Sequence, residues 1–180
     1  SFVRFCIYTL KALSFETDDL LRYIKSGYVR GADGTLLTDE YTDALEMLCR
    51  AFDMRKRDWL RPFPSDIDTV MHLRDKGITR DILEGIRKSV INPLVKLKKD
   101  FENADGAEMT RLLCDLLCSG IDIRGALYGR CITGRTDEGK PLYSREMLAE
   151  MSELWDDTIT VFESAYKALA GHVIPLKEYT

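Results

Sequence analysis

The chain has 180 residues, of which 45% are hydrophobic and 31% are charged, and its formal net charge is −4. This length and composition are typical of a globular domain with a sizeable core, so we expect residues 1–180 to form a single domain. The negative charge excludes a protein whose whole surface binds nucleic acid or anionic lipid, although it still allows a local basic patch.

The N-terminal stretch from Phe2 to Leu13 is apolar and periodic. It is too short for a membrane span and carries Arg4 and Lys11, so it predicts a buried helix and no contact with a membrane. It also lacks the cleavage site of a signal peptide. Ser1 leads into this stretch without an initiator methionine, so we expect a segment cut from a longer polypeptide.

Apolar residues recur with helical spacing along most of the chain. The stretches with this pattern are 17–27, 38–52, 109–120 and 144–170. Thr17 and Thr38 begin the first two, and we expect them to act as N-caps. Strand signals are weak, and the best of them is a small hairpin near residues 131–143. The pattern predicts an all-α fold of about seven helices.

A further helical stretch runs from Ile82 to Phe101, and its apolar phase continues across Pro93. A proline inside a helix removes one hydrogen bond and clashes with the preceding turn, at a cost of about 3 kcal/mol. Because the phase survives, we expect Pro93 inside a kinked helix or between two collinear helices, with Leu94 and Leu97 buried.

The cysteines are odd in number and form no disulfide framework: Cys6, Cys49, Cys114, Cys118 and Cys131. The first four lie on apolar helical faces, where a free cysteine behaves as a small hydrophobic residue. Their spacing matches no zinc or iron–sulfur pattern, even with His72 or His172 added, so we expect buried thiols without metal. Free thiols are typical of a reducing compartment, and we expect the protein to be cytoplasmic.

The stretch TGRTDEGKPLYS contains Gly134, Gly139 and Lys140 with the spacing of a phosphate-binding P-loop. Pro141 stands where a P-loop needs a hydroxyl for magnesium, and no buried strand precedes the stretch. We therefore expect a polar loop that binds no nucleotide, which argues against a small nucleotide hydrolase. The remaining sequence offers no catalytic, cofactor-binding or metal-binding residues.

Two basic clusters are the remaining candidates for function, as contacts to DNA phosphates. The first surrounds Trp59 and includes Arg55, Lys56, Arg57 and Arg61, and the second comprises Lys76, Thr79 and Arg80. The ordinary alternatives are cations at a helix end and, for Thr79, an N-cap. Contacts to phosphates carry no sequence information, so any DNA binding should be non-specific. Because Asp75 and Asp81 flank the second cluster, it should be no tighter than about 10⁻⁴ M at physiological salt.

An ordered set of segments resembles the B subunit of AddAB-type (RexAB-type) ATP-dependent helicase–nucleases. The segments are DDLLRYIKSG (18–27), TDALEMLCRAF (42–52), RKSVINPLVKLKK (87–99), MTRLLCDLLCSGID (109–122) and PLKEYT (175–180). Trp59, expected in a loop, and Trp155 in a long helix complete the set. In that family the matching part is a helical accessory domain inserted in the second RecA-like unit.

The resemblance implies a parent protein that unwinds and resects double-strand DNA ends for recombinational repair, together with an AddA-type partner. The nuclease motif, cluster-binding cysteines and ATP site of the family would lie outside this chain. We therefore expect a non-catalytic domain that scaffolds the partner subunit or guides duplex DNA. The insertion from Cys131 to Ser144 departs from the family pattern. The alternative is a stand-alone helical adaptor that binds protein partners.

Overall fold

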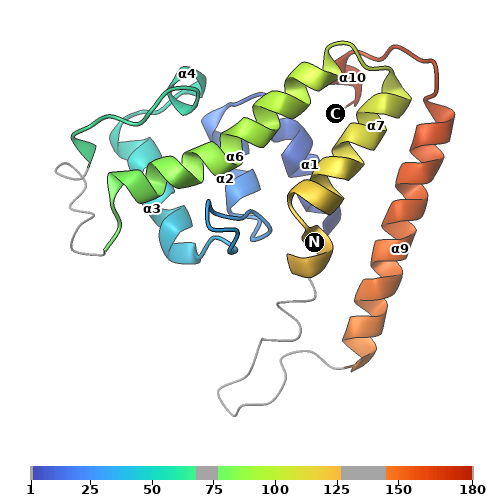
Figure 1. Ribbon diagram of the computed structural model, residues 1–180, viewed down its shortest axis with the longest axis horizontal. Helices are drawn as coiled ribbons and strands as arrows, with labels where there is room; N and C mark the ends of the chain where they lie inside the picture. The colour runs from blue at the N-terminus through green and yellow to red at the C-terminus, as the bar shows by residue number, and fades with distance from the viewer. Residues whose placement is uncertain (1, 68–76, 127–144, 180) are drawn as a thin grey trace. The chain divides into compact units, whose positions relative to one another are not determined.

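A computed structural model describes residues 2–67, 77–126 and 145–179 (Figure 1). Their secondary structure is helical apart from one isolated antiparallel bridge between Arg30 and Leu36, which confirms the all-α prediction. The helices are α1 (Phe2–Ala12), α2 (Thr17–Ile24), α3 (Asp39–Ala51), α4 (Lys56–Trp59), α6 (Arg80–Phe101), α7 (Gly106–Asp115), the π-helical turn η2 (Leu116–Gly120), α9 (Arg145–Ala168) and α10 (Leu176–Tyr179). The hairpin expected near residues 131–143 lies outside the described residues.

The described residues divide into two compact units, one formed by residues 1–98 and the other by residues 99–179. The long helix α6 contributes to both, because the boundary falls between Lys98 and Lys99 near its C-terminal end. Each unit has its own set of buried side chains and is described by itself below. The expected single domain stays a prediction.

In the first unit, aromatic packing joins α1 to α2. Phe5 is fully buried and stacks on Tyr23 with ring centroids 5.4 Å apart. On the opposite face of α1, Val3 and Ile7 are 54% and 42% exposed. The expectation of a buried helix is therefore wrong for one face, because α1 lies at the surface and buries only the stripe that meets α2.

The two expected threonine caps behave differently. Thr17 is the first residue of α2, and its hydroxyl donates to the carbonyl of Met54 (2.7 Å) while accepting from the indole N–H of Trp59 (3.2 Å). The N-cap prediction for Thr17 is wrong because tertiary partners take its hydroxyl. Thr38 does occupy the N-cap position of α3, although its side chain makes no capping hydrogen bond.

Helix α6 runs without interruption from Arg80 to Phe101 and contains Pro93, as predicted. Leu94 is fully buried and Leu97 is 4% exposed, so the apolar stripe holds its phase beyond the proline. Ile82 is the exception, since it is 37% exposed at the solvent side of the first turn.

In the second unit, α7 packs against α9, and the start of α7 approaches the end of α9 closely. Gly106 makes this approach possible, because a Cβ there would lie 2.7 Å from the Cβ of Leu169. Its backbone N–H donates to the carbonyl of His172 (2.8 Å). Asp105 caps α7 by accepting from the N–H of Glu108 (2.8 Å), and its second oxygen accepts from the N–H of Gly171 (2.9 Å). These contacts fix the antiparallel pair at one end.

Candidate nucleic-acid interface

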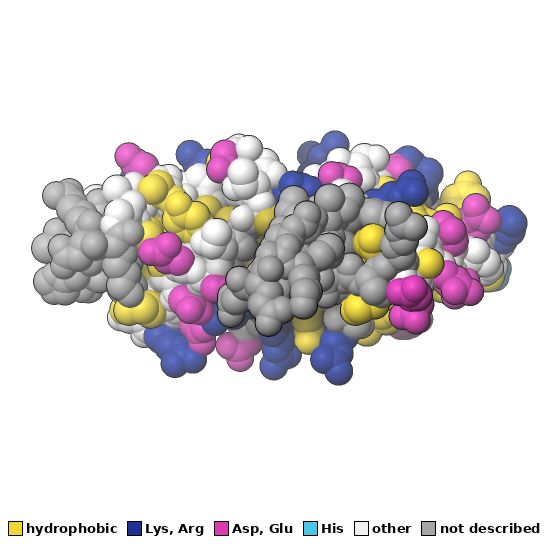
Figure 2. Space-filling model, turned by 90° about the horizontal axis from the view of Figure 1, so that it is seen from below, with side chains coloured by type: hydrophobic (Ala, Val, Ile, Leu, Met, Phe, Trp, Pro, Cys, Tyr) yellow, Lys and Arg dark blue, Asp and Glu magenta, His cyan; other side chains and the backbone are white. Residues whose placement is uncertain are grey.

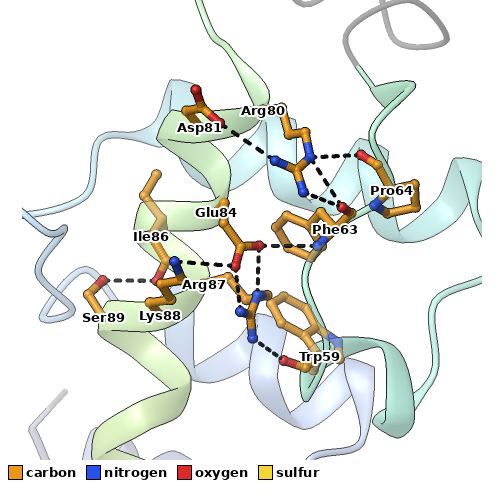
Figure 3. A network of polar contacts seen from close by, with 10 residues as sticks. All are labelled: Trp59, Phe63, Pro64, Arg80, Asp81, Glu84, Ile86, Arg87, Lys88 and Ser89. Carbon is orange, nitrogen blue, oxygen red and sulfur yellow. Dashed lines mark hydrogen bonds and ion pairs between the residues drawn. The ribbon is translucent and has the colours of Figure 1, made fainter.

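The polypeptide that follows α4 is held against α6 by a nearly buried ion pair (Figure 3). Arg87 donates two hydrogen bonds to the carboxylate of Glu84, at 2.5 and 2.9 Å, and a third to the carbonyl of Trp59 (2.8 Å). Glu84 also accepts from the backbone N–H of Phe63 (3.1 Å). The hydrogen bonds from Arg87, followed by that from Phe63, hold the pKa of Glu84 below its ordinary value. The chain between Trp59 and Phe63 is thus anchored at both ends.

Arg80 belongs to the same anchoring network. Its guanidinium donates to the carbonyl of Phe63 (2.8 and 3.2 Å) and to that of Pro64 (3.0 Å), and it lies 3.6 Å from Asp81 (Figure 3). A phosphate contact by Arg80 would have to compete with these bonds. Thr79 accepts from the N–H of Ile82 (3.4 Å), which is the bond of an ordinary N-cap. Lys76 lies outside the described residues, so the predicted phosphate contacts of this cluster remain predictions.

Trp59, expected in a loop, is instead the last residue of the one-turn helix α4 and is fully buried. Its ring packs edge-on against Phe63 with centroids 6.1 Å apart. An indole in this position cannot stack on a base, so the cluster around it can contribute charge only.

The basic side chains around α4 border an open pocket of about 520 Å³. Arg55, Arg57 and Arg61 line it together with Asp53 and Asp58, whereas Lys56 is exposed outside the lining. The remaining lining residues are apolar: Phe52, Met54, Pro62, Phe63 and Pro64.

The three arginines of the pocket differ in how they are paired. Arg55 lies 2.9 Å from Asp53, which raises the pKa of Arg55, and Arg57 lies 3.5 Å from Asp58. None of the described residues forms an ion pair with the side chain of Arg61. The lining therefore carries one more positive than negative charge, and its unpaired guanidinium has a planar set of donors suited to phosphate or carboxylate oxygens.

Sequence reasoning placed Arg61 in the first basic cluster but did not single it out within that cluster. Asp58 lies three residues before Arg61, a spacing that also permits an ion pair, so the sequence does not distinguish Arg61 from Arg55 and Arg57. The structure shows that Asp58 lies beside Arg57 instead.

The cysteines follow the prediction in part. Cys49 is buried, whereas Cys6, Cys114 and Cys118 are half-buried, so the expected burial is wrong for these three. All four are free thiols, and the sulfur atoms of Cys114 and Cys118 lie 3.6 Å apart on successive turns. Cys131 and the P-loop-like stretch from Gly134 to Pro141 lie outside the described residues.

No family model, curated protein or solved structure matches this chain. Within the described part of the chain, no group of histidine, cysteine and acidic side chains has an arrangement that could hold a metal ion. A search of the same residues finds no helix with the length and hydrophobicity that crossing a bilayer requires.

Proposed function

We propose that this chain is a non-catalytic helical domain of the B subunit of an AddAB-type ATP-dependent helicase–nuclease, and that it guides duplex DNA through the arginine pocket beside α4. The parent would act with an AddA-type subunit in resection of double-strand breaks and recombinational repair in the cytoplasm. The sequence resemblance supports the parent family, and the pocket supports the contact to DNA.

The observation that carries the DNA contact is the set of three arginines on an anchored segment. The Glu84–Arg87 pair and the bonds of Arg80 hold the backbone between Trp59 and Pro64, so the guanidinium of Arg61 extends from a fixed position. Contacts of this kind go to the phosphate backbone and carry no sequence information, as tracking along DNA of any sequence requires. Binding should be weak, because the whole chain has a net charge of −4.

The test is fluorescence anisotropy with a labelled duplex of arbitrary sequence, titrated with the whole chain at about 50 and about 200 mM salt. We expect detectable binding only at the lower salt. The Arg57→Ala/Arg61→Ala variant should weaken the binding seen at the lower salt, because two phosphate contacts are lost.

The matched control is Arg4→Ala/Lys11→Ala, which removes the same charge from two exposed positions on α1. If both double variants weaken binding equally, the effect is one of net charge and the pocket is not the site. Tight binding that resists salt or depends on DNA sequence would contradict the proposal itself.

A stand-alone helical adaptor is the second candidate. It is favoured by large apolar side chains exposed on α9, of which Val161 is 66% and Leu154 is 46% exposed. A long parent reading frame with helicase-like flanks and a cysteine-bearing nuclease segment would decide for the first candidate, and a short gene that ends near Thr180 would decide for the adaptor.

A further inference from the structure

Helix α9 carries two apolar stripes, and α7 meets only one of them. Ile159, Phe162 and Tyr166 border a groove of about 280 Å³ with Thr110 and Cys114 of α7. The second stripe is displaced around the helix, and its residues follow one another at alternating spacings of four and three: Leu154, Thr158, Val161, Ala165 and Ala168. We call this second stripe the outer seam.

The outer seam has the spacing by which helices pack along one another. Positions four and three apart form the a and d positions of a heptad, whose side chains insert between those of a facing helix. Leu154 and Val161 occupy equivalent positions one heptad apart and are 46% and 66% exposed. The small side chains of Ala165 and Ala168 would let a second backbone come close near the C-terminal end. The seam spans about two heptads, which suits one docked helix better than a free-standing coiled coil.

Charge decides which helix fits. α9 contains six acidic residues and two basic ones. Glu150 lies four residues before Leu154 and Asp157 three residues after it, so both flank the outer seam on one edge, and Glu153 extends that edge. All three are exposed. Acidic, basic and apolar side chains all lie at the right of Figure 2, the side on which Figure 1 draws α9.

A second copy of this chain would bring the same acidic edge to the interface, and like charges facing each other oppose association. A helix with lysine or arginine along its flank would instead form ion pairs with Glu150, Glu153 and Asp157. We propose that the outer seam of α9 docks an amphipathic helix of a partner protein, with aliphatic a and d residues and a basic flank. This inference does not rest on the proposed function, because the arginine pocket and the outer seam belong to different units.

The test uses two synthetic helical peptides of about three heptads with leucine at a and d, one with lysine and one with glutamate at the flanking positions. Their binding to the whole chain is measured by fluorescence anisotropy. We expect the lysine peptide to bind at least about tenfold more tightly than the glutamate peptide, with an affinity that falls as salt rises.

Two double variants of α9, each with a control variant, test whether the peptide binds at the outer seam. Leu154→Ser/Val161→Ser should weaken the lysine peptide at least about tenfold, because two apolar side chains no longer become buried. The control Val3→Ser/Ile7→Ser changes two exposed apolar residues on α1 and should leave binding unchanged. Glu150→Gln/Asp157→Asn should reduce the preference for lysine over glutamate.

The matched charge control is Asp156→Asn/Glu163→Gln, on the face of α9 turned away from the outer seam, which should leave that preference intact. Equal binding of the two peptides, or equal losses in the seam variant and the α1 control, would overturn the proposal. Self-association of the chain that is abolished by Leu154→Ser/Val161→Ser, with no binding of the lysine peptide, would overturn it in favour of a second copy.

Discussion

The side chain of Arg87 is only 7% exposed, and its guanidinium lies among hydrogen-bond acceptors and an aromatic ring. The Glu84 carboxylate and the carbonyl of Trp59 take its hydrogen bonds, and the ring of Phe63 lies 5.8 Å below the guanidinium. A pair enclosed in this way adds little net stability, since desolvation offsets most of the attraction. Its loss on one side is costly, because the partner charge stays buried.

We therefore predict that Arg87→Ala lowers the free energy of unfolding by about 3–5 kcal/mol, measured by urea denaturation at pH 7. The control is Lys88→Ala, whose ammonium lies 3.9 Å from Glu84 on a side chain that is 60% exposed, and this change should cost about 1 kcal/mol or less. Equal effects of the two variants would mean that burial does not distinguish the two cations.

The same pair has a pH dependence. The pKa of Glu84 is lowered in the folded protein, so its stabilising contribution is complete above the ordinary glutamate pKa of about 4.3 and is lost as the pH falls through the lowered value. The Arg87→Ala variant loses the hydrogen bonds that contribute most to lowering the pKa of Glu84. We predict that the stability difference between wild type and variant shrinks as the pH is lowered from about 7 towards about 3. A difference that stays constant with pH would contradict this assignment.

Cys49 differs from the other described cysteines in burial. Burial, and secondarily the charge of Glu46, raise the pKa of its thiol to about 12, so almost no thiolate forms near neutral pH. We predict that iodoacetamide at pH 8 modifies Cys6, Cys114 and Cys118 of the folded chain while Cys49 stays unmodified, as measured by peptide mass spectrometry. Urea should abolish the difference. Early modification of Cys49 in native buffer would show that α3 opens readily.

At the scale of elements, Pro93 is the position of α6 at which a substitution should raise stability, because it is the internal proline of this helix. An internal proline costs about 3 kcal/mol relative to alanine, whereas its stiffening of the unfolded chain returns at most about 1 kcal/mol. We predict that Pro93→Ala stabilises the protein by up to about 2 kcal/mol in urea denaturation. Asn92→Ala, at the exposed neighbouring position, is the control and should gain less than about 0.7 kcal/mol. Destabilisation by Pro93→Ala would mean that the packing around this position depends on the proline ring.

Helix positions were predictable because an apolar stripe is a local property of the sequence. The stripe from Leu83 to Phe101 and the helical stretch that ends at Gly120 agree with the structure for that reason. The role of Thr17 was not predictable, since its partner Met54 lies 37 residues away. The apolar pattern of α9 also did not predict which of its two stripes α7 covers. Helical periodicity indicates which residues share a face, but it does not indicate which neighbour packs on that face.

The candidate site was predictable in composition but not in geometry. Arg55, Arg57 and Arg61 lie within seven consecutive residues, so their clustering around α4 follows directly. Arg80 has the same type of charge, yet its donors are occupied by carbonyls 16 and 17 residues away. Only the tertiary fold distinguishes an arginine that holds the chain together from one that is available to a phosphate.

At the scale of the whole molecule, charge is unevenly placed. The excess of acidic over basic residues on α9 alone equals the net charge of −4 of the entire chain. The formal charges of all residues outside α9 therefore sum to zero, and the arginine pocket is formed by residues of this part of the chain. A net negative chain can thus carry a phosphate contact in one unit and a docking surface for a basic helix in the other.

The division into two units predicts how the molecule responds to local damage. Leu45 of α3 is fully buried in the first unit, and Leu113 of α7 is 2% exposed in the second. Truncation of either to alanine should cost about 2–5 kcal/mol, because it leaves a cavity. If each unit unfolds cooperatively by itself, the loss of stability should be found mainly in the helices of the unit that carries the substitution.

We predict that Leu45→Ala raises amide hydrogen exchange in α1, α2 and α3 while α7 and α9 keep their protection, and that Leu113→Ala does the reverse, as read by mass spectrometry of the whole chain. Helix α6 belongs to both units, so its exchange should respond to both variants, with the turns before Lys98 following Leu45→Ala. The two substitutions are matched in chemistry and burial, so each is the control for the other. Equal loss of protection throughout the chain in either variant would show one cooperative domain, as the sequence alone predicts.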